Sequence, residues 1–256
     1  MVTVKTPYRV SFAGGGTDLL EYSRKSGGAI VGCAINKYVT VSLDKGKLTS
    51  HSDLASCSGL GGSAAYFSSE YRAKNPTLQK SEVIQYVTTK EQLGQQDQIL
   101  CVSGGLRAVS FNTDDSYMST QIPVPTWLNS CMSIYYMGNR KVEGKSLLTG
   151  IDEDALREQK VFAQLITKDL ISSDFDAFVY HMQEAWESKK KFRPDFLNAH
   201  TIDFEKRLDR YGILAFKLCG AGGGGYALLI HDPYETLPLG IPIKVDLAGQ
   251  VYSQGI

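Results

Sequence analysis

The sequence has no apolar run long enough to cross a bilayer, and its first residues contain no apolar signal core. It also has no excess of one charge, because 27 Lys and Arg residues balance 27 Asp and Glu residues. Without a basic surplus, there is no general attraction to nucleic acid or to an anionic membrane surface. We therefore expect a cytoplasmic protein that binds neither nucleic acid nor membrane.

Cysteine and histidine are scarce and scattered. The five cysteines are odd in number and lack the spacing of metal ligands, and the four histidines show no metal-binding spacing either. In a chain of this size, such cysteines are typical of reduced thiols in a cytosolic protein. The 256 residues are enough for one large domain or two closely packed lobes with a substantial core.

Glycine, in contrast, is abundant and gathers in three segments. The middle one, Ser58–Ala65, reads SGLGGSAA and runs into residues that predict the start of a helix. Glycine allows positive φ and a close approach of backbone to ligand, and a helix N-terminus offers unpaired N–H groups to a phosphate. No Walker-type lysine follows the glycines. The other two segments are Gly14–Asp18 near the start and Gly220–Gly225 near the end.

The spacing of apolar residues predicts an α+β fold. Early strands are expected at 2–5 and 9–13, separated by Pro7, and a hairpin is expected around a turn at Asn36-Lys37. The interval between Leu43 and Ser58 leaves little room for another element. Helical spacing between Asp152 and Lys191 predicts two helices with a break at 172–174. Further helices are predicted at 63–72, 81–93 and 202–211, and further strands at 108–112, 132–137, 215–217 and 226–230.

Two charged residues stand out from their surroundings. Arg9 lies on an otherwise apolar strand, where a charge is costly unless it is paired, so Asp97 or a phosphate is an expected partner. Asp97, within Gln96-Asp97-Gln98, is a candidate general base that would orient an acceptor hydroxyl and take its proton during phosphoryl transfer. The alternatives are a structural ion pair for Arg9 and a surface turn for Asp97.

The three glycine-rich segments together resemble the GHMP kinase superfamily, named after galactokinase, homoserine kinase, mevalonate kinase and phosphomevalonate kinase. The resemblance runs from Thr6 to at least Ile230. The family's middle motif is Pro-x-x-x-Gly-Leu-Gly-Ser-Ser-Ala, and here Ala55 replaces the proline and Gly62 the first serine. It implies a two-lobed fold, with an N-terminal lobe at 1–125 like domain 2 of ribosomal protein S5 and a ferredoxin-like C-terminal lobe at 126–256.

Finer features resemble the branch of the superfamily that phosphorylates sugars at the anomeric hydroxyl. They are Thr6–Arg9 with Gly14–Asp18, Gln96–Gln98 before Gly104-Gly105, and the Trp-x-x-Lys-Lys pattern at Trp186–Lys190. The implied reaction transfers the γ-phosphoryl group of ATP to D-glycero-D-manno-heptose 7-phosphate and gives the 1,7-bisphosphate. A fucokinase-like kinase of an unphosphorylated sugar is the alternative.

The resemblance also implies a role for individual residues. ATP phosphates would be bound by Ser58, Gly59, Leu60, Gly61, Gly62, Ser63 and Ala64 and by Gly222 and Gly223 of the last segment, which packs against the middle one in this family. Mg²⁺ would be bound by Ser63 and Glu91. Arg9 would flank the base and the γ-phosphate. The sugar phosphate would be bound by Gly15, Gly16, Thr17, Asp18, Gly138, Arg140 and Lys189, with Lys190 and Arg193 as further cations.

Simpler interpretations of these residues remain open. Ser63 is also a candidate helix N-cap, Asp18 a candidate N-cap for a helix at 19–24, and Lys189–Lys191 a candidate solvated helix face. At the level of the whole chain, the rivals are a non-catalytic sugar- and ATP-binding regulator and a plain nucleotide-binding module. A close approach of Arg9 to Asp97 would argue against the module. A homodimer is the oligomeric state to test.

Overall fold

The computed structural model describes residues 1–55, 58–91, 94–138, 150, 152–192, 197–235 and 239–255, with the side chain of Glu91 excepted. The strands are β1 Val2–Ala13, β2 Gly28–Asp44, β3 Lys47–Ser52, β4 Leu106–Phe111, β5 Tyr117–Ile122, β6 Met132–Tyr136, β7 Ile213–Leu218, β8 Tyr226–His231, β9 Ile241–Pro242 and β10 Val251–Gln254. The helices are α1 Leu20–Ser26, α2 Gly62–Lys74, α3 Lys80–Glu91, α4 Gln96–Ser103, α5 Leu128–Cys131, α6 Glu153–Ser172, α7 Phe175–Lys190 and α8 Ala199–Glu205, with a 3₁₀ turn at Leu208–Tyr211.

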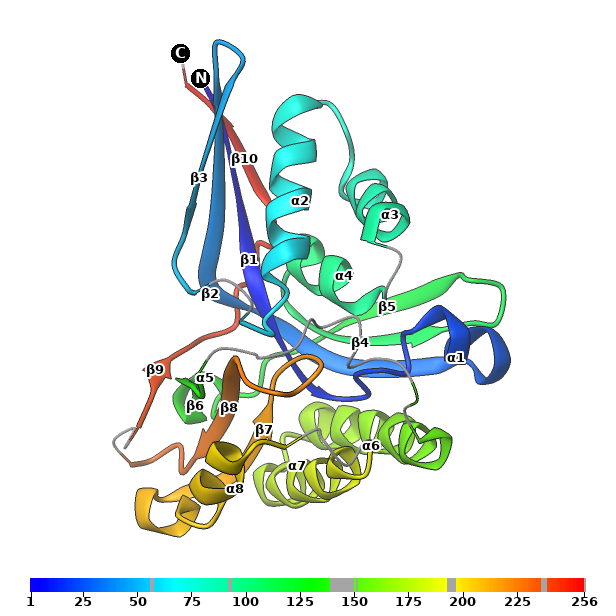
Figure 1. Ribbon diagram of the computed structural model, residues 1–256, viewed down its shortest axis with the longest axis vertical. Helices are drawn as coiled ribbons and strands as arrows, with labels where there is room; N and C mark the ends of the chain where they lie inside the picture. Colours follow the sequence, from blue (N-terminus) through cyan, green and yellow to red (C-terminus); the bar gives the residue numbers. More distant parts are fainter. Residues whose placement is uncertain are drawn as a thin grey trace.

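Two antiparallel sheets organise these elements, which confirms the predicted α+β class (Figure 1). The larger sheet has the order β10-β1-β2-β4-β5, with β3 also paired to β2, and the smaller has the order β7-β8-β6-β9. Helices α2 and α4 pack against β1 and β2, while α6 and α7 pack against each other and link the two sheets. Because β10 returns to pair with β1, the N–H of Gly255 reaches the carbonyl of Met1 at 3.0 Å. The division of the chain at residue 125 stays a prediction.

Strands β1 and β2 are longer than the sequence indicates, and the predicted turn at Asn36-Lys37 is wrong. The register passes from Pro7 opposite Tyr38 to Tyr8 opposite Ile35, so Asn36 and Lys37 form a bulge within one continuous strand. Asn36 is held there by the backbone of Lys244, which accepts from the N–H of Asn36 at 3.0 Å. The register shift also explains why Pro7 is tolerated inside β1.

The sequence analysis does not predict β3, α4, β5, α5, β9 or β10. Strand β3 fills the interval after Leu43, because Lys45 and Gly46 both have positive φ and turn the chain straight back along β2. Its side chains are largely exposed, so it lacks the apolar alternation that predicts a strand. Helix α4 was also missed, although it carries Asp97. The predicted break at 172–174 is confirmed, since Ser173 adopts a left-handed conformation and Asp174 caps α7.

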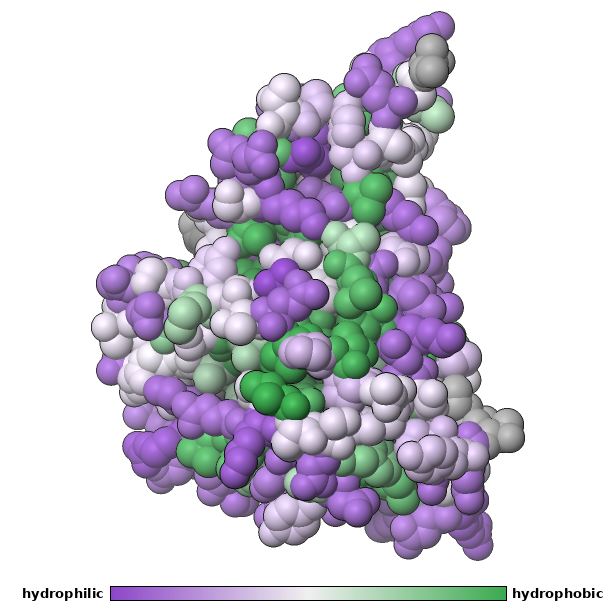
Figure 2. Space-filling model, turned by 180° about the vertical axis from the view of Figure 1, so that it is seen from behind, coloured by the Kyte–Doolittle hydropathy of each residue, from purple (hydrophilic) through white to green (hydrophobic). Residues whose placement is uncertain are grey.

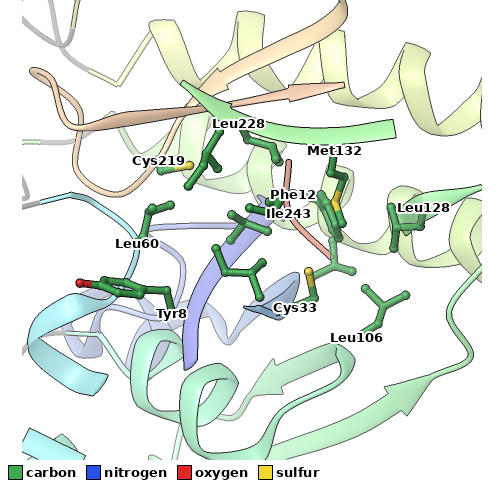
Figure 3. Close-up of a cluster of buried hydrophobic side chains, with 14 of the residues drawn as sticks. Tyr8, Phe12, Cys33, Leu60, Leu106, Leu128, Met132, Cys219, Leu228 and Ile243 are labelled. Atoms are coloured by element: carbon green, nitrogen blue, oxygen red, sulfur yellow. The ribbon is translucent and has the colours of Figure 1, made fainter. Parts of the chain in front are cut away.

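One hydrophobic core lies across the boundary between the two sheets. Its largest cluster contains Phe12 from β1 together with Met132 and Leu228 from β6 and β8. Figure 3 shows these side chains with Leu60, which comes from the middle glycine segment, and Cys219, which precedes the last one. The loops are therefore anchored in the core that joins the sheets.

The surface and the buried thiols have the following properties. Among the described helices, none is long and apolar enough to cross a membrane. The four described cysteines, Cys33, Cys101, Cys131 and Cys219, are buried. Seen from behind, the molecule carries an apolar strip bordered by hydrophilic side chains (Figure 2).

Candidate active site

The middle glycine segment forms a left-handed turn that opens helix α2. Gly59 and Gly61 have φ values of 76° and 78°. Gly61 is the N-cap of α2, and no side chain caps this helix end, so its first N–H groups face outward for a ligand. The N-cap interpretation of Ser63 is therefore wrong, because Ser63 lies inside the first turn with its side chain exposed. The geometry fits an anion at the positive end of the helix.

Arg9 ties this loop to Asp97. The guanidinium donates from Nε and Nη2 to Oδ1 of Asp97, at 2.8 and 2.5 Å, and from Nη1 to the carbonyl of Gly59 at 2.7 Å. The backbone N–H of Arg9 also reaches the carbonyl of Leu60 at 2.9 Å. Arg9 is 2% exposed. Burial acts to lower the pKa of Arg9, but the Asp97 carboxylate outweighs burial, so the pKa is raised and the charge is kept.

Asp18 fixes the start of α4, where Asp97 lies. Its two carboxylate oxygens accept from the backbone N–H groups of Gly16 and Gln96, both at 3.1 Å. It does not cap α1, whose N-cap is Leu19 without a side-chain bond, so that interpretation is wrong. Burial is the main cause that raises the pKa of Asp18. Asp18 thus joins the first glycine segment to the helix of the candidate base.

The first glycine segment packs between β2 on one side and α6 with the residue Phe192 on the other. The Thr17 hydroxyl donates to the carbonyl of Gly14 at 2.8 Å and accepts from the N–H of Ala29 at 3.1 Å. It therefore ties the loop to β2. A Cβ added to Gly15 would lie 3.7 Å from both Lys189 Nζ and the Gln96 side-chain amide. Gly16, with φ of 102°, lies against α6 and the residues after α7. Gly15 is therefore the glycine next to polar groups.

The last glycine segment packs against the middle one, as the resemblance implies. The N–H of Tyr226 donates to the carbonyl of Ser58 at 2.9 Å. The N–H of Gly225 donates to the carbonyl of Gly138 at 2.8 Å, which brings Gly138 to the same loop. Gly222 and Gly223 have φ values of 86° and 73°, conformations that favour glycine. The last and middle glycine segments are thus hydrogen-bonded to each other, and Lys189 connects the last segment with the first.

Lys189 is buried rather than solvated. It is 3% exposed, and its amine donates to the carbonyl of Gly220 at 3.1 Å. The solvated-face interpretation holds for Lys191, which is exposed beside Glu158, but not for Lys189. Lys190 pairs with Glu205 at 2.8 Å. Arg140, Arg193 and the Glu91 side chain lie outside the described residues.

Sequence reasoning missed two residues of this site. Lys217 on β7 is 3% exposed, and its amine donates to the Ser11 carbonyl at 2.6 Å. The signal was a lysine on an apolar strand, the same argument that selected Arg9. Gln96 has a buried side-chain oxygen that no hydrogen bond satisfies within the described residues. No sequence signal identifies that oxygen, because it depends on how α4 packs.

The described residues fit the phosphates of a nucleotide better than a protein-held metal. The open N-terminus of α2 offers backbone N–H groups and the Ser63 hydroxyl. No cluster of three or more His, Cys, Asp or Glu side chains that could hold a metal occurs in this part of the chain. A Mg²⁺ ion that is bound to nucleotide phosphates needs only one or two protein oxygens, and a serine hydroxyl can be one of them.

Comparisons with known proteins agree with this arrangement. No protein-family model matches the sequence. A curated D-glycero-alpha-D-manno-heptose 7-phosphate kinase from Campylobacter jejuni is 23% identical over 93% of this chain and 91% of its own length. That alignment spans 310 positions, more than the 256 residues of this chain, so the relative has segments that this chain lacks.

Solved structures share the whole fold. A D-glycero-D-manno-heptose 1-phosphate kinase from Bacteriodes thetaiotaomicron covers 100% of both chains with a TM-score of 0.80 and 19% identity. Mevalonate kinase from Methanococcus jannaschii covers 91% of this chain and 90% of its own, with a TM-score of 0.69 and 16% identity. Fold and glycine-rich segments define the class, a two-lobed α+β protein with a glycine-rich turn at the start of a helix. The chain has the fold of these kinases, in line with its resemblance to the GHMP kinase superfamily.

Proposed function

We propose that this protein is an ATP-dependent sugar-phosphate kinase. In the finer form of the proposal, it transfers the γ-phosphoryl group of ATP to the anomeric hydroxyl of D-glycero-D-manno-heptose 7-phosphate. The observation that carries the proposal is the Arg9–Asp97 pair, bonded to the carbonyl of Gly59 in the phosphate loop. This contact places a carboxylate next to the loop that would hold the donor, and a plain nucleotide-binding module has no need of it.

The residues divide the chemistry between them. The phosphate loop and the N-terminus of α2 bind the donor, and Ser63 offers a hydroxyl to Mg²⁺, which would neutralise phosphate charge when bound. Arg9 donates twice to Oδ1 of Asp97, so we assign the acceptor hydroxyl to Oδ2. The acceptor hydroxyl binds there, its oxygen attacks the γ-phosphorus, and its proton passes to Asp97 as the bond to ADP breaks.

Lys189 supports a phosphorylated acceptor. Its buried amine lies next to Gly15 in the segment proposed for the sugar and donates to the carbonyl of Gly220 in the last glycine segment. Cations that bind phosphate well are needed only if the acceptor carries one. A kinase of a free sugar, similar to fucokinase, would not require this amine.

Asp97→Asn tests the catalytic assignment. We expect ATP consumption with Mg²⁺ and heptose 7-phosphate to fall about 10²- to 10⁴-fold, because the amide cannot accept the proton. Asp203→Asn is the matched control, since it breaks an exposed Asp–Arg pair far along the chain and should leave activity unchanged. Thermal melting of both variants shows whether Arg9, left with an amide, still allows folding.

A panel of acceptors separates the candidate functions. Turnover of heptose 7-phosphate alone supports the proposed heptose 7-phosphate kinase. Turnover of free heptose or L-fucose would instead support a fucokinase-like enzyme. Binding of ATP without turnover of any sugar, in a protein that has Asp97 intact, would instead support a regulator. Sedimentation of the same sample tests the predicted homodimer, for which the apolar strip in Figure 2 is a suitable surface.

A further inference from the structure

Three buried cations gather where the first and last glycine segments meet. Arg9 comes from β1, Lys189 from α7 and Lys217 from β7, and each is 2–3% exposed. Charged side chains are rarely buried this deeply unless they are paired. Arg9 has Asp97, so its charge is balanced within the fold. Lys217 is the residue whose burial the proposed reaction has not yet explained.

The surroundings of Lys217 favour an anion. The groups that act on its charge are Lys189 and Arg9, both cations, and the thiol of Cys219. Burial raises the pKa of Cys219, so this thiol stays neutral near pH 7 and does not balance the charge. The Lys217 amine itself donates to the carbonyl and, at 3.4 Å, to the hydroxyl of Ser11. Both of these acceptors are uncharged.

The position of the amines indicates where an anion would lie. Lys189 Nζ is next to Gly15 on one side and bonded to the carbonyl of Gly220 on the other. Lys217 stands three residues before Gly220 and reaches across to Ser11, two residues after Arg9. Since residues two apart on a strand share a face, Ser11 and Arg9 point to the same side of β1. The two amines therefore lie between the first and last glycine segments.

We propose that Lys217 is a phosphate-binding residue of this site, which exchanges its bond to Ser11 for a phosphate group held jointly with Lys189. The inference rests on the proposed function only for the identity of the ligand. Burial, with help from Lys189 and Arg9, lowers the pKa of Lys217 well below its ordinary value, so without a ligand the amine gives up its proton readily. An entering phosphate stabilises the charged form, and binding is then accompanied by proton uptake.

Titration calorimetry of the full chain tests this proposal. The probes are inorganic phosphate, ADP and ribose 5-phosphate, each measured at pH 8 in two buffers with different ionisation enthalpies. We expect net proton uptake in the wild type, and in Lys217→Met a loss of uptake with an affinity about tenfold to a hundredfold lower. A larger loss with ADP assigns the phosphate to the nucleotide, and a larger loss with ribose 5-phosphate assigns it to the sugar.

Controls separate this role from a structural one. Lys168→Met removes an exposed amine from α6 and should change neither affinity nor proton uptake. If Lys217→Met does not fold, Lys217→Gln keeps a donor without the charge and serves in its place. Unchanged phosphate affinity and unchanged proton uptake in the folded variant would overturn the proposal. Lys217-dependent phosphate binding in a protein that turns over no sugar would leave it standing and refute the proposed function instead.

Discussion

At the scale of single residues, the sequence was informative wherever a charge interrupts an apolar strand. That argument predicted a partner for Arg9, and the pairing with Asp97 is confirmed. The same argument applies to Lys217 in β7 and would have found it. The buried oxygen of Gln96 was beyond reach, because burial of one amide atom depends on tertiary packing. Catalytic roles for Arg9 and Asp97 stay predictions.

His231 gives a prediction about pH. It is 1% exposed on β8 and its Nε2 lies 2.6 Å from the Ser133 hydroxyl. Burial lowers its pKa to about 4, from an ordinary value of about 6.5. The unfolded chain therefore binds a proton first as the pH falls, so stability is lost between pH 6.5 and 4. At pH 5, this one group should lower the free energy of unfolding by about 2 kcal/mol relative to pH 7.5.

Urea unfolding at both pH values measures this effect. His231→Gln should lose less stability on acidification than the wild type, because the glutamine does not titrate. His200→Gln, at an exposed position, is the control and should behave like the wild type. An equal loss for His231→Gln and the wild type would show that other groups cause the acid sensitivity.

At the scale of elements, capping residues and apolar periodicity predicted most of the helices well, whereas the bounds of the long strands were predicted poorly. The break between α6 and α7 was found because polar capping residues stand there. Asn36-Lys37 was misinterpreted because a bulge and a turn use the same polar residues, and only the partner strand tells them apart. Strand β3 was missed because an exposed strand shows no apolar alternation.

The junction before α4 gives a second prediction. A Cβ on Gly94 would lie 1.8 Å from Oδ2 of Asp18, so Gly94→Ala must push Asp18 away from the N–H of Gln96. The candidate base Asp97, which follows Gln96, is then displaced. A displacement of about 1 Å can lower activity about 10²-fold. Overpacking should also reduce stability by about 1–3 kcal/mol.

Gly255→Ala is the matched control, since its nearest neighbour would be 3.7 Å away and its backbone does not require positive φ. Steady-state kinetics and thermal melting of both variants measure the two effects. Full activity in Gly94→Ala would mean that the Asp18 contact does not position α4.

At the scale of the whole molecule, the sequence predicted the class of fold and the order of its glycine-rich segments. It did not predict that β10 returns to β1, because a short exposed strand has no distinctive pattern. It also did not predict that both sheets share one core, because that depends on which apolar faces meet. The shared core determines how the molecule should unfold.

We predict a single unfolding transition for both lobes. The cluster that contains Phe12 spans the two sheets, so one sheet cannot melt without exposing the core of the other. Circular dichroism and the fluorescence of Trp127 and Trp186 should give the same midpoint in urea. Phe12→Ala should shift both signals together by about 3–5 kcal/mol. Two separate midpoints would show that the lobes are independent.

The pairing of β10 with β1 has a consequence for engineering. The chain ends lie side by side at one tip of the larger sheet (Figure 1), with Gly255 bonded to Met1. A short linker could join them as an ordinary hairpin, and the exposed turn at Lys45-Gly46 could be opened instead. Such a circular permutant would keep the β1–β10 ladder and leave both new ends at the same tip of the sheet as the native ends, which makes that turn a suitable attachment point for a fused domain or a surface tether.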